Sequence, residues 1–391
     1  DLCWEANAPA SIARALAGRQ PDAVAVTFRN TDDCYFSSGC SFVPMLQKDI
    51  AAIRQHYDGP VIIGGCGFSV MPELLLEHVG AEFGAHGDGE ATLPAFLQAI
   101  RSKLEFAKVP GLVFKSGGQW RRNSQAMADL SKLRLSDRAI IDNVRYFRHG
   151  GQAGIETKRG CPGRCIYCAD PVIKGHRPRL RPPADVAREM RNLLAQGIDT
   201  FHLCDSEFNR PPAHADAVCR AIIAAGLSRK IRWFTYACPV PMPRGRLALM
   251  QKAGCAGVNF GVDSGNDRML RSLGRAFIAA DILRTARHCR DLRLKFMLDL
   301  LIGGPGETWA MVADTLTMVR SANPTCAGIS LGVRIYPGTP LAEAFQTGKR
   351  TPGLIGKPNG IAPAYFLSPA LGRNPLARIK KLVGTDERFF L

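Results

Sequence analysis

Several features that mark other protein classes are missing from this 391-residue sequence. No stretch approaches the roughly 18 uninterrupted apolar residues of a transmembrane helix, so we expect no contact with a membrane. Neither sequence repeats nor low-complexity tracts occur, and 46% hydrophobic and 22% charged residues are ordinary for a globular protein. The sequence therefore excludes a disordered chain, a collagen-like fibre and a small disulfide scaffold. Its length indicates two domains.

The thirteen cysteines do not form regular pairs. Most lie within apolar runs, as Cys66 does in VIIGGCGF and Cys204 in FHLCDSE. In a reducing compartment cysteines are buried hydrophobes or metal ligands, so we expect a cytoplasmic protein. The chain opens at Asp1 without a Met or a signal-peptide pattern, and we expect the first strand and helix of the fold to precede it.

Acidic side chains become scarce beyond residue 100. Residues 1–100 hold 5 basic and 12 acidic side chains, a net charge of −7, whereas residues 101–391 hold 46 and 22, a net charge of +24. This shift favours a domain boundary between about residues 100 and 150. A basic domain suits nucleic acid or an anionic small molecule, but an ordinary solvated basic surface explains the charge equally well.

The first hundred residues alternate between strand and helix. Apolar, β-rich runs at 23–30, 60–67 and 81–89 are separated by stretches of helical spacing at 42–56, 72–79 and 91–100. This order predicts a doubly wound, Rossmann-like parallel sheet over residues 1–105. Such sheets bind ligands beyond the carboxyl ends of their strands, which here are rich in glycine. Residues 106–154 resemble a connector with a hairpin at 111–120.

The alternation resumes at residue 155 with a longer period. Six β/α units predict a partial (β/α)6, TIM-like barrel over residues 155–345, with its chemistry at the carboxyl ends of the strands. Residues 346–391 form a tail rich in Gly and Pro that we expect to be irregular. The expected strands are 155–160, 200–205, 231–237, 257–263, 294–304 and 328–336.

A cysteine motif follows the first expected barrel strand. Cys161, Cys165 and Cys168 have the spacing C-x3-C-x2-C on a loop. Three thiolates leave one iron of a [4Fe-4S] cluster without a protein ligand, and that iron can bind a cofactor or substrate. The alternative is a structural zinc site, for which His176 is the nearest fourth ligand.

On this motif and its barrel context, residues 155–345 resemble the radical S-adenosylmethionine (SAM) enzymes. The resemblance implies that SAM chelates the open iron through its amino and carboxylate groups. It also implies roles for the loops that follow the later strands: Glu207 would bind the SAM amino group or reach the iron, and Asp263 with Ser264 would bind the ribose. The other residues implied in SAM binding are Tyr167, Ser206, Gly303 and Gly304.

The order of the domains resembles the cobalamin-dependent members of that group. The segments GGCGFSVMPE (64–73) and GAHGDGEATL (84–93) look like that subgroup's strand ends, and no Asp-x-His-x-x-Gly motif supplies a cobalt ligand from below. Arg29 would lie under cobalt, where a permanently protonated guanidinium blocks a lower ligand. The residues implied in cobalamin binding are Arg29, Asn30, Thr31, Asp32, Gly64, Gly65, Gly67, Ser69, Gly87, Gly89 and Glu90.

These cofactors together imply methyl transfer from SAM, via methylcobalamin, to a carbon of a small molecule. The RNTDD stretch and the Asp-Ser-Glu sequence at 205–207 resemble the tryptophan C2-methyltransferases of natural-product biosynthesis. Tyr236 would then act as a base near the indole nitrogen, and Arg334 would hold a substrate carboxylate. A ferredoxin or flavodoxin is the expected electron donor, and nucleic acid is not an expected partner.

Three alternatives remain open at the level of sequence. One is a cobalamin-dependent radical rearrangement or cyclisation. Another is a tRNA or protein methylthiotransferase, in which Cys3, Cys34 and Cys66 would hold a second cluster. The third is a non-catalytic, basic RNA-binding protein. Iron content separates the last two from a single-cluster enzyme.

Overall fold

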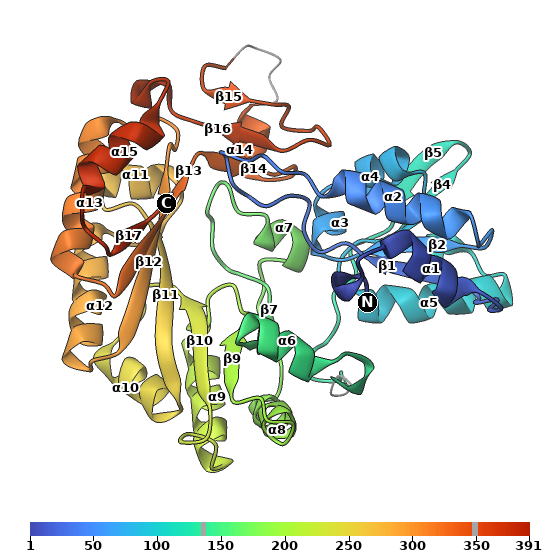
Figure 1. Cartoon of the computed structure of the whole chain (residues 1–391), viewed down its shortest axis with the longest axis horizontal. Helices are drawn as coiled ribbons and strands as arrows, with labels where there is room; N and C mark the ends of the chain where they lie inside the picture. The colour runs from blue at the N-terminus through green and yellow to red at the C-terminus, as the bar shows by residue number, and fades with distance from the viewer. Residues whose placement is uncertain (134–137, 346–350) are drawn as a thin grey trace.

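The computed structural model describes residues 1–133, 138–345 and 351–391. Two α/β domains lie side by side, with the N-terminal domain at the right of Figure 1 and the barrel domain at the left. Each of the two main sheets belongs to one domain. In the described residues, no helix is both long and apolar enough to cross a membrane.

The N-terminal sheet has five strands in the order β1-β2-β3-β4-β5. Its first three strands are parallel, and the last two are antiparallel. The first three residues of β2, Val61–Ile63, are buried and carry side chains into both faces, as expected for a sheet covered on both sides. The strands are β1 (Val24–Thr27), β2 (Val61–Gly64), β3 (Phe83–Ala85), β4 (Leu112–Ser116) and β5 (Gln119–Arg122).

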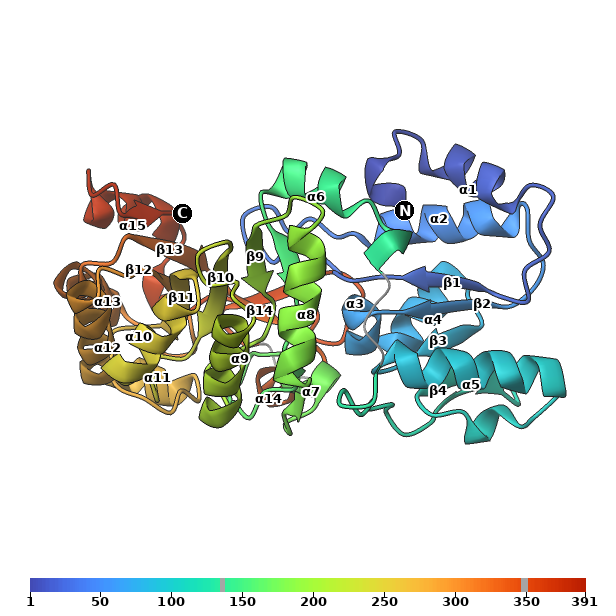
Figure 2. The ribbon, with the colours of Figure 1, turned by 90° about the horizontal axis from the view of Figure 1, so that it is seen from below.

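Helices cover the two faces of this sheet, which makes it doubly wound as predicted (Figure 2). Val61 and Ile63 pack among side chains of α1, α2 and α4, whereas Ile62 packs on the other face with Phe96 of α5. The helices are α1 (Ala8–Leu16), α2 (Val43–Arg54), α3 (Cys66–Val70), α4 (Pro72–Val79) and α5 (Gly89–Ser102).

The hairpin expected at 111–120 is present as β4 and β5, but it is part of the first domain rather than of a connector. β4 pairs with β3 from Leu112 to Phe114, so the sheet continues past the boundary expected at residue 105. Hydrophobic periodicity could not place the hairpin, because its pairing partner lies some thirty residues earlier in the chain.

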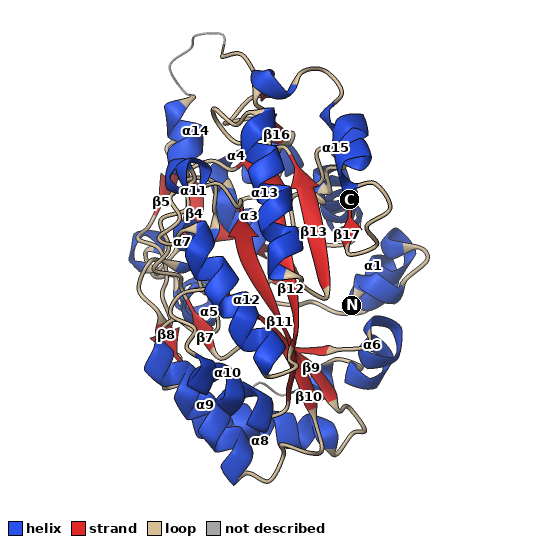
Figure 3. Cartoon of the chain, turned by 90° about the vertical axis from the view of Figure 1, so that its left-hand side faces the viewer, coloured by secondary structure: helices blue, strands red, loops and turns tan. Residues whose placement is uncertain are grey.

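The barrel domain is built on a seven-stranded parallel sheet in the order β17-β13-β12-β11-β10-β9-β6. Helices lie along one face of this sheet (Figure 3). Burial alternates strictly along β10 and β12, because one side chain packs under the helices and the next faces the concave side. The strands are β6 (Ala153–Ile155), β9 (Thr200–Leu203), β10 (Arg232–Ala237), β11 (Cys255–Asp263), β12 (Lys295–Ile302), β13 (Cys326–Leu331) and β17 (Phe389–Phe390).

The helix-facing side chains form the largest core of the molecule, centred on Trp233 and Phe201. The opposite, concave face carries half-buried side chains and several glycines, so these side chains do not form a second closed core. The cysteine loop is followed by α7 (Asp170–Lys174), which packs against α3 of the first domain. The later helices of the barrel domain are α8 (Pro183–Leu194), α9 (Pro212–Ala224), α10 (Arg244–Lys252), α11 (Asp267–Ser272), α12 (Ala279–Asp291) and α13 (Trp309–Ala322).

Two segments differ from the sequence-based expectation. The first barrel strand ends at Ile155, and Lys158–Arg159 instead forms β7, which pairs with β8 (Arg179–Leu180). The tail is not irregular, because it contributes β17 to the barrel sheet and a small antiparallel sheet beside it. The remaining elements are α6 (Asn143–Gly150), α14 (Pro340–Ala344), α15 (Pro375–Val383), β14 (Val333–Ile335), β15 (Leu354–Ile355) and β16 (Ala364–Phe366).

Candidate active site

The cysteine loop leaves β7 and ends at α7, at the edge of the barrel that faces the N-terminal domain (Figure 1). Backbone bonds hold it in shape: Cys161 N donates to Gly175 O at 3.1 Å, and Cys168 N donates to Cys165 O at 3.2 Å. Gly160 has φ +93°, and a Cβ there would lie 2.5 Å from the Arg177 carbonyl oxygen. The loop therefore needs a glycine directly before its first cysteine.

The three thiols are suited to a metal cluster rather than to solution chemistry. Burial raises the pKa of each thiol, and raises that of Cys168 to about 12. A bound iron reverses this effect, since metal coordination deprotonates a thiol. Among the described residues no three Cys, His, Asp or Glu side chains converge on one ion position, which leaves the zinc alternative with His176 unsupported. A [4Fe-4S] cluster places each thiolate on a different iron and does not need that convergence.

Glu207 lies beside the cysteines with an unused acceptor. Its Oε2 atom is buried and accepts no hydrogen bond from the described residues. Its charge raises the pKa of Cys161, and Arg210 Nε lies 3.4 Å from Oε2. A buried, unsatisfied carboxylate oxygen near the Cys161 and Cys165 thiols fits a role toward the cluster or toward the SAM amino group.

The neighbouring Asp205 and Ser206 have other partners. Asp205 is 2% exposed and accepts from the backbone of Thr157 at 2.8 Å and of Lys158 at 3.2 Å, so it fixes the turn before the cysteine loop. Ser206 donates to the Asp170 carboxylate in α7. Its hydroxyl therefore supports the loop, and the sequence-based role in direct SAM binding is not supported by this contact.

Asp263 stands at the centre of a hydrogen-bonded group next to the cysteine loop. The Tyr167 hydroxyl donates to it at 2.6 Å, and Arg275 Nε lies 3.2 Å away. Arg275 also donates to the Cys165 thiol at 2.8 Å, so one guanidinium joins a cluster cysteine to the carboxylate expected to bind ribose. Arg275 could not be predicted from the sequence, because no motif signals it.

Ser264 makes its hydrogen bond to α13. It is fully buried, and its hydroxyl shares a 3.0 Å hydrogen bond with Thr315 in α13. The side chain anchors the turn after β11 to α13. The ribose-binding role expected of Ser264 beside Asp263 stays a prediction that this contact does not support.

The glycine turn after β12 wraps around a buried carboxylate. Gly303 has φ +111°, and a Cβ at Gly304 would lie 3.0 Å from Met269 Cε. The backbone N–H groups of Gly303 and Gly304 both donate to Glu307. Burial raises the pKa of Glu307 to about 7. These glycines permit the turn, and an approaching SAM would meet their backbone edge.

The N-terminal domain brings its own strand ends to the same region. A Cβ at Gly65 would lie 2.6 Å from the Phe28 carbonyl oxygen, and a Cβ at Gly67 would lie 3.0 Å from that of Arg29. The two glycines thus let the loop after β1 pass close to α3. Gly64 ends β2, with its Cβ position 3.5 Å from Ala85, and Gly89 has open space around it.

Other residues expected to bind cobalamin make protein contacts. Ser69 Oγ accepts from Gly87 N at 3.2 Å. A Cβ at Gly87 would lie 2.3 Å from Ala126 O, so that glycine serves chain packing. Glu90 forms an ion pair with Arg159 at 2.7 Å, which links the two domains.

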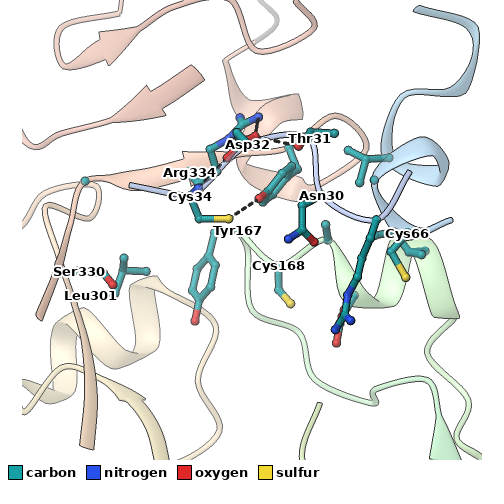
Figure 4. Close-up of a pocket in the computed structure, with 18 residues that line it drawn as sticks. Asn30, Thr31, Asp32, Cys34, Cys66, Tyr167, Cys168, Leu301, Ser330 and Arg334 are labelled. Carbon is teal, nitrogen blue, oxygen red and sulfur yellow. Dashed lines mark hydrogen bonds and ion pairs between the residues drawn. The ribbon is translucent and has the colours of Figure 1, made fainter. Parts of the chain in front are cut away.

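A cavity of about 400 Å³ opens between the two domains (Figure 4). In the close-up, Asn30 and Cys66 lie on the side of the N-terminal domain, Cys34 lies beside Arg334, and Tyr167 and Cys168 come from the cysteine loop. We call this the inter-domain cavity; its further lining includes Arg29, Thr31, Asp32, Gly67, Asp170, Leu301, Ser330, Arg334 and Tyr336. It joins the cysteine loop to the cobalamin-like strand ends.

The two arginines of the inter-domain cavity differ in their partners. Arg29 is exposed, and within the described residues it has no ion pair. Arg334 is 8% exposed and donates to Asp32 at 2.8 Å, as well as to Ala364 O at 3.1 Å. These contacts occupy most of the Arg334 donors, so they do not support its expected role in holding a substrate carboxylate, which stays a prediction. Thr31 donates to Asp32 at 2.8 Å, so these two residues serve the domain contact.

Tyr236 lies at the end of β10 on the concave face and is 41% exposed. Its ring centroid lies 5.3 Å from that of His202. Burial and the nearby Asp299 charge raise the pKa of Tyr236, so the phenol remains protonated near neutral pH. A neutral phenol can orient an N–H group, but it is a poor base.

The three cysteines of the alternative second cluster do not share one environment. Cys3 lies near Tyr146 of α6, whereas Cys34 Sγ lies 3.1 Å from the Tyr336 hydroxyl. Cys66 begins α3. This arrangement does not favour a methylthiotransferase.

Known proteins resemble this chain over its cysteine-loop domain and over most of its sequence. The model of the radical SAM superfamily matches residues 155–319. Tryptophan 2-C-methyltransferase of Streptomyces laurentii is 30% identical over 388 residues, which cover 83% of this chain. The chain spans 65% of the length of that curated relative.

Two solved structures extend the comparison to the fold. The methyltransferase TsrM of Kitasatospora setae, with cobalamin and a [4Fe-4S] cluster bound, matches at a TM-score of 0.89 and 30% identity, covering 98% of this chain and 84% of that chain. The same protein has been solved with tryptophan and the SAM analogue aza-SAM. The cobalamin-dependent radical enzyme OxsB, at 18% identity and a TM-score of 0.70, shares the fold over 82% of this chain and 46% of its own.

Proposed function

Because this chain belongs to the cobalamin-dependent radical SAM methyltransferases, we propose that it moves a methyl group from SAM, by way of cobalamin, to a carbon of a small molecule. We further propose C2 of tryptophan as that carbon, in natural-product biosynthesis. The observation that carries the proposal is the inter-domain cavity, in which the unpaired Arg29 and the cluster loop residue Cys168 line one space. The chain's 30% identity to TsrM, of which it covers 84%, supports the substrate.

The residues present fit the three cofactors. Cys161, Cys165 and Cys168 would hold the [4Fe-4S] cluster, with the unsatisfied Glu207 oxygen beside them. Asp263 and the Gly303–Gly304 backbone would hold SAM. The inter-domain cavity would receive cobalamin, and when bound this cofactor supplies a carrier that accepts a methyl group and passes it on.

Arg29 would act by excluding a ligand of the cobalt rather than by supplying one. A guanidinium stays protonated and does not ligate a metal, so its presence under the corrin would exclude a lower ligand. Asp32 is held by Arg334 and Asp33 accepts from Tyr35 N at 3.1 Å, so neither carboxylate pulls Arg29 away. Tyr236, protonated on the concave face, would orient the indole N–H of the substrate rather than remove its proton.

We propose that an acidic electron carrier, such as a ferredoxin or flavodoxin, reduces the enzyme in the cytoplasm. A second cavity of about 500 Å³ is lined by Cys165, Glu207 and Arg275, with Arg164 and Arg271 also in its lining. Arg164 and Arg271 are exposed and have no carboxylate partner among the described residues. This basic rim next to a cluster ligand suits an acidic partner, whose binding would weaken with salt.

The test is methyl transfer from SAM carrying a labelled methyl group. The protein is purified without oxygen, loaded with iron, sulfide and hydroxocobalamin, and supplied with SAM and tryptophan. We expect label at C2 of the indole ring, and none when hydroxocobalamin is left out or when Cys168 is replaced by Ala. Formation of 5′-deoxyadenosine without a methylated product would contradict the proposal and favour a radical rearrangement or cyclisation.

A further inference from the structure

The side chain of Arg275 links the cysteine loop to the end of β11. Arg275 follows α11 in the chain, and 8% of its side chain is exposed. Its Nη1 atom donates to Cys165 Sγ at 2.8 Å, its Nε atom lies 3.2 Å from Asp263 Oδ2, and its Nη2 atom donates to Gly261 O. The methyl-transfer scheme assigns no role to this buried cation.

Backbone contacts hold the segment before Arg275 directly against the cysteine loop. Ile166 N donates to Leu273 O at 3.1 Å. Gly274 has φ +77°, and a Cβ there would lie 2.3 Å from the carbonyl oxygen of Arg164. A larger residue at this glycine would push the two segments apart. The contact between the guanidinium and the loop is therefore set by the backbone on both sides.

The cluster cysteines differ in the donors that reach their sulfur atoms. Cys161 Sγ accepts from the backbone N–H of Gly163 at 3.4 Å, whereas Cys165 Sγ accepts from the guanidinium. Among the described residues, Arg275 is the one side-chain cation that donates to a sulfur atom of the three cysteines. A full positive charge therefore lies beside one of the three protein ligands of the cluster.

Two carboxylates lie near the same guanidinium. Asp263 is 3.2 Å from Arg275, and Glu207 Oε1 is 4.0 Å from its Nη1 atom. Glu207 has a second cation in Arg210, but Asp263 forms no other ion pair in the described parts of the chain. Removal of the guanidinium would thus leave the Asp263 carboxylate without its cation, and charges act strongly on one another in a buried site.

We infer that Arg275 raises the reduction potential of the [4Fe-4S] cluster, through its positive charge and its hydrogen bond to Cys165. Net charge and hydrogen bonds to the sulfur atoms set the potential of such clusters. Reduction adds one electron, here from the acidic carrier of the proposed function, and a guanidinium stabilises the added negative charge without losing a proton. Arg275 acts through Cys165 and is a positioning residue. The inference rests on the cluster that the proposed function requires.

A redox titration followed by electron paramagnetic resonance tests the inference. The protein is purified without oxygen and loaded with iron and sulfide, and the wild type is compared with Arg275→Met. Methionine is unbranched and can still pack on the Phe277 ring, which lies 5.0 Å from the guanidinium carbon, but it carries no charge. At a fixed applied potential, we expect the ratio of reduced to oxidised cluster to fall at least about tenfold, which is about 59 mV for one electron. Equal midpoint potentials would overturn the inference.

Two further variants assign the shift to the charge at this position. Arg275→Lys keeps the positive charge without the planar fork, so we expect it to recover part of the lost potential. Arg287→Met removes a cation from the exposed side of α12 and should leave the potential as in the wild type. A lysine variant with a potential as low as that of Arg275→Met would contradict the role of the charge.

A measurement on the wild type keeps the inference testable if Arg275→Met holds no cluster. The protein is produced with arginine that carries heavy nitrogen in its guanidinium, and the reduced cluster is examined by pulsed electron paramagnetic resonance. We expect a hyperfine coupling to the labelled nitrogen, and its loss in Arg275→Lys labelled in the same way. A wild-type cluster without this coupling would overturn the inference.

The inference and the proposed function fail in different ways. If Arg275→Met lowers the potential but no methyl group reaches tryptophan in the wild type, the role of Arg275 stands and the proposed function is wrong. If tryptophan is methylated but Arg275→Met keeps the potential of the wild type, the role of Arg275 is wrong and the proposed function stands.

Discussion

The guanidinium of Arg334 in β14 lies 2.8 Å from the carboxylate of Asp32, which follows β1 in the other domain. Both side chains are buried, at 8% and 2% exposure. The residues are 302 positions apart in the chain and form the wall between the two halves of the cofactor site. The pair fixes how the strand ends of the first domain face the cysteine loop of the second.

Breaking that pair should destabilise the protein. Arg334→Gln leaves the Asp32 carboxylate buried without its cation, and we expect a loss of about 3 kcal/mol in the free energy of unfolding. Denaturant titration measures it. Arg188→Gln, at an exposed i,i+3 pair on α8, should change the same quantity by less than about 0.5 kcal/mol. Equal effects of the two substitutions would contradict a buried structural pair.

The same pair predicts acid sensitivity. Burial favours the protonated form of Asp32, but its bonds to Arg334 outweigh this and lower its pKa below 3.8. A carboxyl group with a lowered folded-state pKa contributes stability above its unfolded pKa, and that contribution is lost as the pH falls through the folded-state pKa. Asp32→Asn should therefore flatten the fall in melting temperature below about pH 4. If the melting temperature of Asp32→Asn fell with acid as steeply as that of the wild type, this role of the Asp32 carboxylate would be contradicted.

Glu307 should change the stability with pH in the opposite direction to Asp32. Its pKa is raised to about 7 by burial, so the folded protein holds a proton that the unfolded chain releases near pH 4.5. Stability should thus decline as the pH rises from about 4.5 to 7 and level off above it. Glu307→Gln keeps an acceptor for the Gly303 and Gly304 N–H groups, and it should remove this decline. Melting temperatures from pH 5 to pH 8 for the two proteins measure the difference.

Iron content tests the cluster. We expect about four irons per chain in the wild type and near none in Cys168→Ser, because each cysteine holds one iron and the loop cannot replace it. Cys40→Ser, an exposed cysteine of the first domain, should keep the full content. About eight irons per chain would favour the methylthiotransferase alternative over the single cluster.

The visible spectrum of bound cobalamin tests the proposed role of Arg29. Arg29→His offers an imidazole where the guanidinium had excluded a lower ligand, so the visible corrin spectrum should shift and turnover should fall by about tenfold or more. Arg121→Ala, on the exposed side of β5, should alter neither. A histidine variant with the spectrum and turnover of the wild type would remove Arg29 from the mechanism.

The order of the domains and the cluster loop could be predicted from the sequence because their signals are local. The C-x3-C-x2-C spacing lies within eight residues, and the strand–helix alternation within about twenty. The protein contacts of Arg334 and Ser264 could not be predicted, because their partners, Asp32 and Thr315, are set by tertiary packing. Arg275 bonds to a cysteine 110 positions away, and no pattern along the chain announces such a contact.

Corrin content tests the central claim most directly. The protein is purified without oxygen in the presence of hydroxocobalamin, freed of unbound ligand by gel filtration, and its visible spectrum is recorded. About one corrin per chain is the predicted result, since the inter-domain cavity joins the glycine-rich strand ends to the cluster loop. A protein that carries its iron–sulfur cluster but retains no corrin would contradict the account.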